Sequence, residues 1–488
     1  MPKNTFFIST AIDYVSGPPH LGHLYEKILA DVIARWKRLG GYKVHFSTGT
    51  DEHGLKIQRA AEKQGKTPKE FVDYISRFFL NLCKVYNISY DDFIRTTEKR
   101  HEDVVKKIIN KINENGFIYK GSYEGLYCVE CENFYTEKDL IKGKCPVHKK
   151  ELEIKKEDGY FFKMSEFQSK LIKHIEKHPE FILIQKKRNE IYNRLKIPLR
   201  DLSITRKDVW GLEFPLDKNF SQFVWVEALI NYLTTIDYPN KKFKEFWPGA
   251  HLIGPDILWQ HTVIWGSIIM SINLKLPKVL NHGFINLKGE KMSKSVGNVI
   301  DPFELAKKYH VDAIRYFLIR EIPFGEDGNF SEEALKDRLN NELANDLGNL
   351  LSRVLTIAEK NFSGKIKKNK IDEKLISKLD VKKIENFMND FKLTEVLNEI
   401  WTFVKSCNKH INDEKLWAMN PTDQEKHLYS LFESIRIIAL LLSPFIPETS
   451  GKIYMQLGTS CSSLKEAKFG LIEHYMVKKG PILFNKIK

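Results

Sequence analysis

The sequence predicts an α/β protein in which a doubly wound parallel sheet is followed by an all-α domain. Residues 5–11 are apolar and β-branched, as in a buried strand, and a Gly-Pro-Pro turn follows them. The apolar side chains of residues 20–39 recur at helical spacing up to a Gly-Gly pair, and residues 43–48 alternate as a second strand. This strand–helix–strand order is how a doubly wound sheet begins. From Ser331 onward long helical patterns dominate, and no clear strand is expected.

The remaining elements continue the alternation with one interruption. Thr67, Pro68 and Glu70 provide an N-cap, a helix-starting proline and a capping-box acid for the helix that follows. A further helix covers roughly residues 99–115. Between residues 117 and 160 glycine, tyrosine and clustered cysteines replace the helical pattern, which indicates a small inserted module. Alternation resumes to about residue 320, and the basic C-terminal end is expected to form a final helix or a tail packed on the body.

Composition excludes several classes of protein. The chain has 488 residues, 42% of them hydrophobic and 29% charged, which is a globular mixture and not that of a disordered or fibrous chain. Six cysteines are too few for a disulfide framework in a chain of this length. Lysine and arginine number 77 against 63 acidic residues, a formal net charge of +14. Such a charge suits a polyanionic partner, but composition alone fits a lysine-rich solvated surface equally well.

Two apolar stretches are candidates for membrane or targeting segments, and neither favours a membrane protein. The N-terminus has too short an apolar stretch, and no small-residue cleavage pattern, for a signal peptide. Residues 257–274 are apolar, but they contain Gln260, His261 and Asn273 and follow a Gly-Pro-Asp break. A buried helix that lines a site fits this pattern better than a lipid-facing span. We therefore expect no membrane contact and a cytoplasmic location.

Four metal-binding residues form one cluster. Cys128 and Cys131 are followed, after thirteen intervening residues, by Cys145 and His148. Three thiolates and an imidazole suit tetrahedral zinc, so the spacing predicts one structural zinc ion per chain with no catalytic role. The alternatives are disulfides or unrelated free thiols, and a reducing cytosol argues against disulfides. The isolated cysteines are each expected to be buried apolar residues; they are Cys83, Cys407 and Cys461.

Two short motifs have the chemistry of a nucleotide site. His20-Leu21-Gly22-His23 stands at the start of the first helix, where N–H groups and the helix dipole favour phosphate. Lys291-Met292-Ser293-Lys294-Ser295 lies between glycines at 289 and 297, which favours a mobile loop. Its two lysines would neutralise negative charge on a transferring phosphate. Alone, the histidine motif is a weak signal and the lysine motif also fits an ordinary surface loop.

Together the two motifs resemble the signature pair of class I aminoacyl-tRNA synthetases. Within that class nearly the whole chain is similar to the methionyl-tRNA synthetase family, and the cysteine cluster sits where that family inserts its zinc-bearing connective peptide. The resemblance implies a Rossmann-type catalytic domain in residues 1–116 and 221–330, the last part carrying the lysine loop. It places the connective insertion in 117–220 and a helical anticodon-binding domain with a C-terminal tail in 331–488. Further support comes from AIDY (11–14), GTDEHG (49–54), VWVEA (224–228), IGPDI (253–257) and HGF (282–284).

The resemblance also implies an activity, that of a methionine–tRNA ligase. Such an enzyme activates L-methionine with Mg·ATP to methionyl-adenylate and transfers it to the 3′ end of tRNA(Met), including the initiator tRNA. The catalytic positions would be His20, His23, Lys291 and Lys294. The methionine-binding positions would be Ala11, Ile12, Tyr14, Asp51, Trp225, Ala228, Tyr232, His261 and Trp265, with Asp51 on the ammonium group. The ATP-binding positions would be Glu26, Gly254, Asp256 and Ile285.

Two parts of the methionine-pocket assignment can be judged only by comparison with the family. The aromatic residues Trp225, Tyr232 and Trp265 would otherwise be read as plain core residues. Gln260 departs from the family, which usually has phenylalanine before the histidine, so one wall of the methionine pocket is undefined.

The helical domain contains the residues that the resemblance assigns to the tRNA anticodon. Asn349 and Arg353 match base-reading positions, and Trp417 matches the tryptophan on which bases stack. Without the family, Asn349 and Arg353 would be one polar face of a helix. The net positive charge then has a natural partner in the tRNA backbone. Because the sequence ends after the helical domain, a monomer is expected.

Two rival interpretations remain at this point. Another class I synthetase, for cysteine or a branched aliphatic amino acid, shares both nucleotide motifs, although this chain has no room for the editing insertion of the branched-chain enzymes. A non-catalytic RNA-binding relative is the second rival, and the intact histidine and lysine motifs argue against it. Pyrophosphate exchange across a panel of amino acids separates these possibilities.

Overall fold

The computed structural model describes residues 4–487, apart from 129–132, 136, 138–139, 147–148, 288 and 292–298. The chain divides into two compact units, each assembled from segments that are far apart in the sequence. The first unit contains Met1–Pro19, His45–Leu82 and Tyr90–His282. The second contains His20–Val44, Cys83–Ser89 and Gly283–Lys488.

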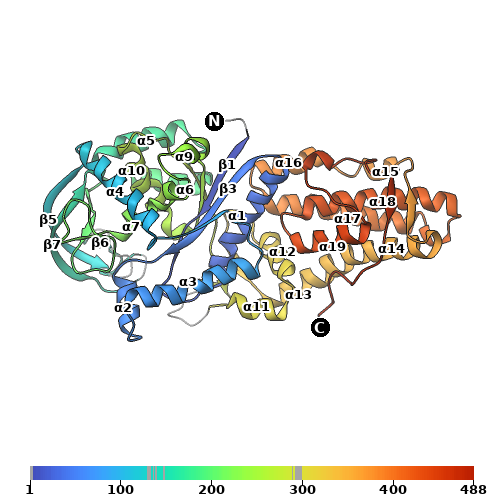
Figure 1. Cartoon of the computed structure of the whole chain (residues 1–488), viewed down its shortest axis with the longest axis horizontal. Helices are drawn as coiled ribbons and strands as arrows, with labels where there is room; N and C mark the ends of the chain where they lie inside the picture. The colour runs from blue at the N-terminus through green and yellow to red at the C-terminus, as the bar shows by residue number, and fades with distance from the viewer. Residues whose placement is uncertain are drawn as a thin grey trace. The chain divides into compact units, whose positions relative to one another are not determined.

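A parallel sheet forms the centre of the first unit. Its strand order is β12-β11-β1-β3-β2, with β4 also paired to β3. β1 and β3 lie side by side (Figure 1). β1 pairs in parallel with β11, β11 with β12, and β3 with both β2 and β4. Such crossovers define a doubly wound sheet, so the predicted fold class is confirmed. The strands are β1 (Thr5–Thr10), β2 (Asp13–Tyr14), β3 (Lys43–Asp51), β4 (Asp92–Arg95), β11 (Ala250–Ile253) and β12 (Lys278–Asn281).

One helix of this unit, α3, begins where local capping predicts. The N–H of Thr67 donates to Glu70 Oε2 at 3.0 Å and the N–H of Glu70 donates to Thr67 Oγ1 at 3.3 Å. This reciprocal pair satisfies the first N–H groups of α3, which begins at Pro68. The helices are α2 (Leu55–Glu62), α3 (Pro68–Val85), α4 (Lys99–Glu114), η2 (Met164–Phe167), α5 (Gln168–Lys177), α6 (Gln185–Arg194), α7 (Val224–Leu229), α8 (Asn231–Thr234) and α9 (Lys241–Phe246).

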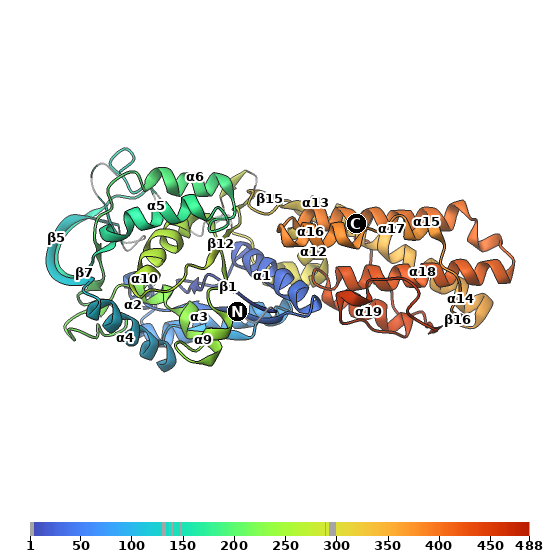
Figure 2. The same cartoon turned by 90° about the horizontal axis from the view of Figure 1, so that it is seen from above.

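An antiparallel sheet begins where the sequence changes character after residue 116. Its order is β6-β5-β7-β8. β5 and β7 form a long hairpin whose register runs from Ile118 opposite Phe162 to Tyr127 opposite Glu153 (Figure 2). The strands are β5 (Ile118–Cys128), β6 (Asn133–Tyr135), β7 (Glu153–Phe162) and β8 (Leu202–Ser203), and a separate pair joins β9 (Thr205–Arg206) to β10 (Ser221–Gln222).

The apolar stretch at residues 257–274 is a broken, buried helix. It follows the 3₁₀ turn η3 (Pro255–Ile257) and consists of the π-helical turn η4 (Gln260–Ile264) and α10 (Trp265–Ser271). His261 and Trp265 are 2% and 0% exposed. The helix is therefore buried, as expected. Within the described part of the chain, no helix has the length and apolar character needed to span a bilayer.

A fully buried ion pair organises the second unit. Arg315 of α12 (Val311–Glu321) and Asp31 of α1 (Leu21–Leu39) approach to 2.7 Å, and neither side chain is exposed. The guanidinium also donates to three backbone carbonyls, those of Tyr86, Pro444 and Phe445. Burial disfavours the charged form of Asp31, but Arg315 and a second arginine outweigh it and hold the pKa of Asp31 below its ordinary value. The helix that begins with the histidine motif is thereby anchored within this unit.

Most of the second unit is helical, as expected. In both views α14, α17, α18 and α19 run alongside one another (Figures 1 and 2). Its further helices are α11 (Pro302–Lys308), α13 (Glu332–Asp337), the π-helical η5 (Arg338–Gly348), α14 (Asn349–Phe362), α15 (Glu373–Ile376), α16 (Val381–Asn389), α17 (Leu393–Asp413), η6 (Leu416–Ala418), α18 (Pro421–Leu442), α19 (Pro447–Leu457) and η7 (Leu464–Glu466). A small sheet contains β13 (Ile285–Leu287), β14 (Glu290–Lys291) and β15 (Gly328–Phe330).

Two details of the helical part differ from expectation. β16 (Lys365–Lys367) and β17 (His474–Met476) form an antiparallel pair, although no strand was expected after residue 331. Each strand has only three residues, so neither produces a recognisable alternation. Cys83 and Cys407 are fully buried as expected, but Cys461 is half-buried, so that prediction was wrong. It lies in a loop after α19, where its Sγ is 3.3 Å from a guanidinium nitrogen of Arg436.

The C-terminal end is a tail packed on the helices. Leu483 and Phe484 are 5% and 4% exposed. The backbone of Ile487 exchanges two hydrogen bonds with the side chain of Asn340, at 2.8 and 2.9 Å. Of the two expected possibilities, the structure therefore has the packed tail and not a final helix.

Candidate functional site

Three of the residues assigned to methionine lie together in the core of the first unit. The hydroxyl of Tyr232 is 2.6 Å from Nε2 of His261, and Nδ1 of His261 is 2.9 Å from the carbonyl oxygen of Ile257. A carbonyl only accepts, so Nδ1 carries the proton and Nε2 accepts from the tyrosine. Burial lowers the pKa of His261 to about 4, so the ring is neutral at pH 7. Trp265 packs beside this hydrogen-bonded pair, with its ring centroid 5.9 Å from that of Tyr232.

His251 belongs to the same cluster and was missed by the sequence analysis. Its ring stacks on Tyr232 with centroids 3.8 Å apart. The indole N–H of Trp265 donates to Nε2 of His251 at 3.3 Å, which leaves Nδ1 to donate to the hydroxyl of Ser9 at 2.7 Å. Burial lowers the pKa of His251 well below its ordinary value. The only available signal was one histidine within the apolar strand β11, which has no distinguishing pattern.

The other methionine candidates lie at the carboxyl ends of parallel strands or on α7. Asp51 is the last residue of β3, is 7% exposed, and lies in register with Tyr14 of β2. The N–H of Ala11, directly after β1, donates to the carbonyl of Leu252 at 3.1 Å. Open α/β sheets bind ligands at this edge. Ile12 follows Ala11 in the chain, and Trp225 and Ala228 are on α7.

Glu227, next to Ala228, is a positioning residue that the sequence analysis did not identify. Its two carboxylate oxygens lie 2.9 Å from Nδ1 of His53 and 3.0 Å from Nε2 of His101, and all three side chains are buried. Burial opposes the charged form, but the two imidazoles outweigh it and lower the pKa of Glu227. Both His53 and Glu227 stand in family motifs, GTDEHG and VWVEA. Through these contacts, Glu227 holds α7 against His53, in the segment that follows β3.

Gln260 has an unusual environment. Its amide oxygen is shielded from solvent and accepts no hydrogen bond from the described residues. The ring of neighbouring Trp259 lies 3.8 Å from the guanidinium carbon of Arg194. A shielded amide oxygen without a donor costs about 1–3 kcal/mol, so a donor from a bound molecule would be favourable here.

The two motif histidines stack at the start of α1 in the second unit. Nδ1 of His20 accepts from the N–H of Gly22 at 3.1 Å, and the N–H of His20 donates to Nδ1 of His23 at 3.0 Å. The ring centroids are 3.8 Å apart. Because both Nδ1 atoms accept, both protons are on Nε2. The helix start therefore combines two imidazole N–H groups with its own positive end, which suits an anion.

The lysine motif is only partly within the described residues. Lys294 lies outside them, and Lys291 is described only in its backbone, where it pairs with Asn286 in the β13–β14 hairpin next to Ile285. The carbonyl of Ile300, just beyond the motif, accepts from the N–H of Leu21 at 3.1 Å. The chain that leaves the lysine motif therefore contacts the first turn of the histidine-bearing helix.

The remaining ATP candidates occupy both units. Glu26 is buried on α1, and Ile285 is buried on β13. Gly254 directly follows β11 in the first unit, and Asp256 is exposed in the 3₁₀ turn after it. An exposed carboxylate beyond the carboxyl end of a parallel strand suits ribose hydroxyls.

Two of the four expected zinc ligands are described. Cys128, at the end of β5, and Cys145 are both fully buried. The N–H of Cys145 donates to the carbonyl of Lys150 at 2.9 Å. Cys131 and His148 lie outside the described residues.

The anticodon candidates lie on α14 and on the turn between α17 and α18. Asn349 and Arg353 are one helical turn apart, and Asn349 donates to Asn345 at 2.9 Å. Arg353 donates to the side chain of Asn412 at 2.6 Å, near the end of α17. Trp417, five residues further on, is 59% exposed. A core tryptophan would be buried, so this exposure favours a binding role.

Known proteins resemble this chain over its whole length. The family model described as "tRNA synthetases class I (M)" matches residues 6–153 and 138–355, and "Anticodon-binding domain of tRNA ligase" matches 372–479. The methionine–tRNA ligase of Caldanaerobacter subterraneus subsp. tengcongensis is 47% identical, covering 99% of this chain and 79% of the relative. The Bacillus subtilis enzyme of the same name is 40% identical, covering 100% and 79%. The Mycobacterium tuberculosis methionyl-tRNA synthetase, solved in complex with methionyl-adenylate, has a TM-score of 0.95 at 36% identity, covering 99% of both chains.

The chain belongs to the methionyl-tRNA synthetase family. Its activity is that of an aminoacyl-tRNA synthetase, the ATP-dependent ligation of methionine to tRNA. The rival assignments, to a synthetase for cysteine or a branched amino acid and to a non-catalytic relative, are therefore set aside.

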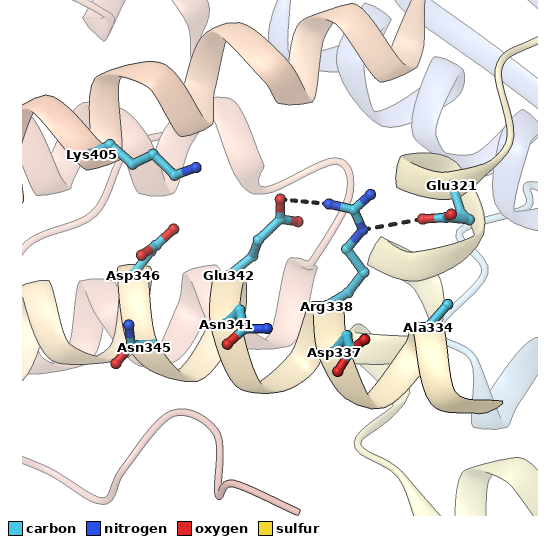
Figure 3. Close-up of a pocket in the computed structure, with 9 residues that line it drawn as sticks. All are labelled: Glu321, Ala334, Asp337, Arg338, Asn341, Glu342, Asn345, Asp346 and Lys405. Carbon is cyan, nitrogen blue, oxygen red and sulfur yellow. Dashed lines mark hydrogen bonds and ion pairs between the residues drawn. The ribbon is translucent and has the colours of Figure 1, made fainter. Parts of the chain in front are cut away.

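One cavity of the second unit is unsuited to a nucleotide. It has a volume of about 470 Å³ and lies along α13 and η5 of the second unit. Figure 3 shows Arg338 between Glu321 and Glu342, with ion pairs at 3.1 and 2.8 Å. Four carboxylates and two cations line it, so it repels phosphate. The lining residues are Glu321, Ala334, Asp337, Arg338, Asn341, Glu342, Asn345, Asp346 and Lys405.

Proposed function

We propose that the buried cluster around Tyr232 and His261 binds the side chain of L-methionine. A neutral imidazole and a phenol hydrogen-bonded to each other present polarizable rings and no net charge, which suits a thioether. Asp51, at the carboxyl edge of the sheet, would bind the ammonium group by a charge-assisted hydrogen bond. The full set is Ala11, Ile12, Tyr14, Asp51, Trp225, Ala228, Tyr232, His261 and Trp265.

For ATP, the assignment begins with His20 and His23. Their Nε2–H groups and the start of α1 would bind phosphate oxygens. Lys291 and Lys294 would neutralise the pyrophosphate as it leaves. Mg²⁺ accompanies ATP and supplies further charge neutralisation. Glu26, Gly254, Asp256 and Ile285 would hold the nucleoside, with Asp256 on the ribose and Ile285 on the adenine.

The proposed chemistry requires no protein nucleophile. An oxygen of the methionine carboxylate attacks the α-phosphorus in line, and the bond to the bridging oxygen breaks. Pyrophosphate departs with that electron pair, which leaves methionyl-adenylate. A hydroxyl of the 3′-terminal ribose of tRNA then attacks the adenylate carbonyl and AMP leaves. The enzyme contributes position and charge stabilisation.

Selection of tRNA(Met), including the initiator, is assigned to Asn349, Arg353 and Trp417. The exposed indole would stack an unpaired anticodon base, a contact worth about 1–3 kcal/mol. Zinc at Cys128, Cys131, Cys145 and His148 is proposed as structural, within a connective module at residues 117–220. The catalytic domain is assigned to 1–116 and 221–330, and the anticodon-binding domain to 331–488.

The hydrogen-bonded series Tyr232–His261–Ile257 is the observation that carries this proposal. Tyr232→Phe removes one neutral hydrogen bond worth about 0.5–1.5 kcal/mol. Because His261 then loses the partner that orients its ring, the Michaelis constant for methionine in pyrophosphate exchange should rise, with little change in that for ATP. Tyr74→Phe, at a half-exposed tyrosine of α3, is the matched control. An unchanged methionine constant would assign Tyr232 to the core alone.

A further inference from the structure

Two histidines and a carboxylate converge in the helical part of the second unit. Asp372 immediately precedes α15, His410 is in the last turn of α17, and His427 is near the start of α18. Nε2 of His410 lies 2.9 Å from Nδ1 of His427. Oδ2 of Asp372 lies 3.9 Å from the first nitrogen and 3.7 Å from the second. These side chains are only 5%, 12% and 15% exposed for His410, His427 and Asp372.

The three separations suit a single metal ion. A triangle with sides of 2.9, 3.7 and 3.9 Å has a circumradius of about 2.1 Å. A point equidistant from the three atoms is therefore one zinc bond length from each, since Zn–N and Zn–O bonds are about 2.0–2.2 Å. That point lies in the plane of the three atoms, so a tetrahedral ion needs the donors to shift by a few tenths of an ångström, and it would replace the hydrogen bond between the two imidazoles.

Local hydrogen bonds hold the carboxylate in this position. Oδ1 of Asp372 accepts from the N–H of Lys374 at 2.8 Å and caps α15. The N–H of Asp372 donates to the hydroxyl of Ser430, on α18, at 3.0 Å. Oδ2 is the oxygen that lies nearest both imidazoles. Such supporting bonds are typical of metal-ligating carboxylates.

We propose that Asp372, His410 and His427 bind one divalent first-row transition-metal ion, with zinc the first candidate. Two imidazoles and one carboxylate favour zinc and its neighbours over magnesium or calcium, which prefer oxygen ligands alone. Three protein ligands leave the fourth tetrahedral position to water. The site is distinct from the cysteine cluster in residues 128–148.

The position of the site indicates what the metal would do. His410 and His427 flank the segment that carries Trp417, so an ion bonded to both closes that segment into a loop. Within it, the amide of Gln424 donates to the carbonyl of Leu416 at 2.7 Å. The metal would therefore order the turn that presents Trp417. This consequence, unlike the metal site itself, rests on the proposed role of Trp417.

Zinc content of the full chain tests the site. We expect unmodified protein, loaded with zinc and dialysed, to retain one equivalent more than His427→Gln or Asp372→Asn protein. His474→Gln, at an exposed histidine of β17, is the control and should match the unmodified chain. Equal zinc content in the unmodified and His427→Gln chains would overturn the proposal.

A second measurement needs no variant. Zinc-edge X-ray absorption of the unmodified chain distinguishes sulfur from nitrogen and oxygen ligands. If both the Asp372–His410–His427 site and the cysteine cluster bind zinc, the spectrum should contain two zinc populations. One has only nitrogen and oxygen ligands, and the other has mainly sulfur ligands. If the cysteine cluster binds no zinc, the first population should still be present. A spectrum of sulfur-rich sites alone would overturn the proposal.

Activity then tests the consequence for RNA. Loss of this zinc by His427→Gln should raise the Michaelis constant for tRNA by about 10-fold, comparable to the loss of one stacking contact. Methionine-dependent pyrophosphate exchange should not change. Loss of zinc with an unchanged tRNA constant would support the metal site and overturn its link to Trp417.

Discussion

Replacing His261 by glutamine should remove an acid-sensitive contribution to the stability of this protein. The pKa of an unperturbed histidine is about 6.5, and burial lowers that of His261 to about 4. The unfolded chain therefore binds this proton more tightly, so acid favours unfolding. The stabilisation is complete above pH 6.5 and is lost as the pH falls toward 4. At 1.36 kcal/mol per pH unit, the total is about 3 kcal/mol.

The assay is urea unfolding, followed by far-UV circular dichroism at a series of pH values. Glutamine can still donate to the carbonyl of Ile257 and accept from Tyr232, so the two proteins should differ little near neutral pH. Their free energies of unfolding should then diverge as the pH falls, and the His261→Gln protein should become the more stable by up to about 3 kcal/mol, because only the histidine protein loses this term. Titrating groups that do not interact with residue 261 cancel in the difference; His251 does not, because burial and then His261 lower its pKa. His474→Gln controls for an exposed site. Parallel pH dependences for the unmodified and His261→Gln proteins would refute this reasoning.

Three further outcomes are expected. Arg315→Leu leaves the buried Asp31 carboxylate with only the partly exposed Arg35 as a cation and should cost about 3–5 kcal/mol in urea unfolding, of which a second change, Asp31→Asn, should recover part; no recovery would contradict the ion-pair explanation. Lys291→Ala should slow pyrophosphate exchange by about 10²–10³-fold while methionine affinity, measured by equilibrium dialysis, hardly changes; an unaltered rate would remove the loop from the chemistry. Trp417→Ala should raise the Michaelis constant for tRNA by about 5- to 150-fold and spare adenylate formation; equal loss in both assays would indicate a core role.

Much of the secondary structure was predictable because its determinants are local. The helix over residues 20–39 ends at Gly40, and α3 begins at the capping box of Thr67 and Glu70. Caps and helical periodicity depend on neighbours within about four residues, so they are visible in the sequence. The small pair β16–β17 was not predictable, because its three-residue strands gain stability only from each other, more than 100 residues apart.

In the candidate site, too, some features were predictable from the sequence and others were not. Tyr232, His261 and Trp265 were named through the family, since an isolated aromatic residue does not reveal whether it binds a ligand or fills a core. The tautomer of His261 became evident only when Ile257 and Tyr232 were placed against its two nitrogens. The contacts of His251, and those of Glu227 with His53 and His101, could also be recognised only in the folded structure.

By itself the sequence determined the fold class, the two nucleotide motifs and the family, because each rests on residue type and short spacing. Only the tertiary structure brought Asp372 to His410 and His427 and exposed Trp417 on its turn. The physical reason is that burial, proton position and metal geometry depend on ångström-scale distances between residues whose separation along the chain carries no information about them.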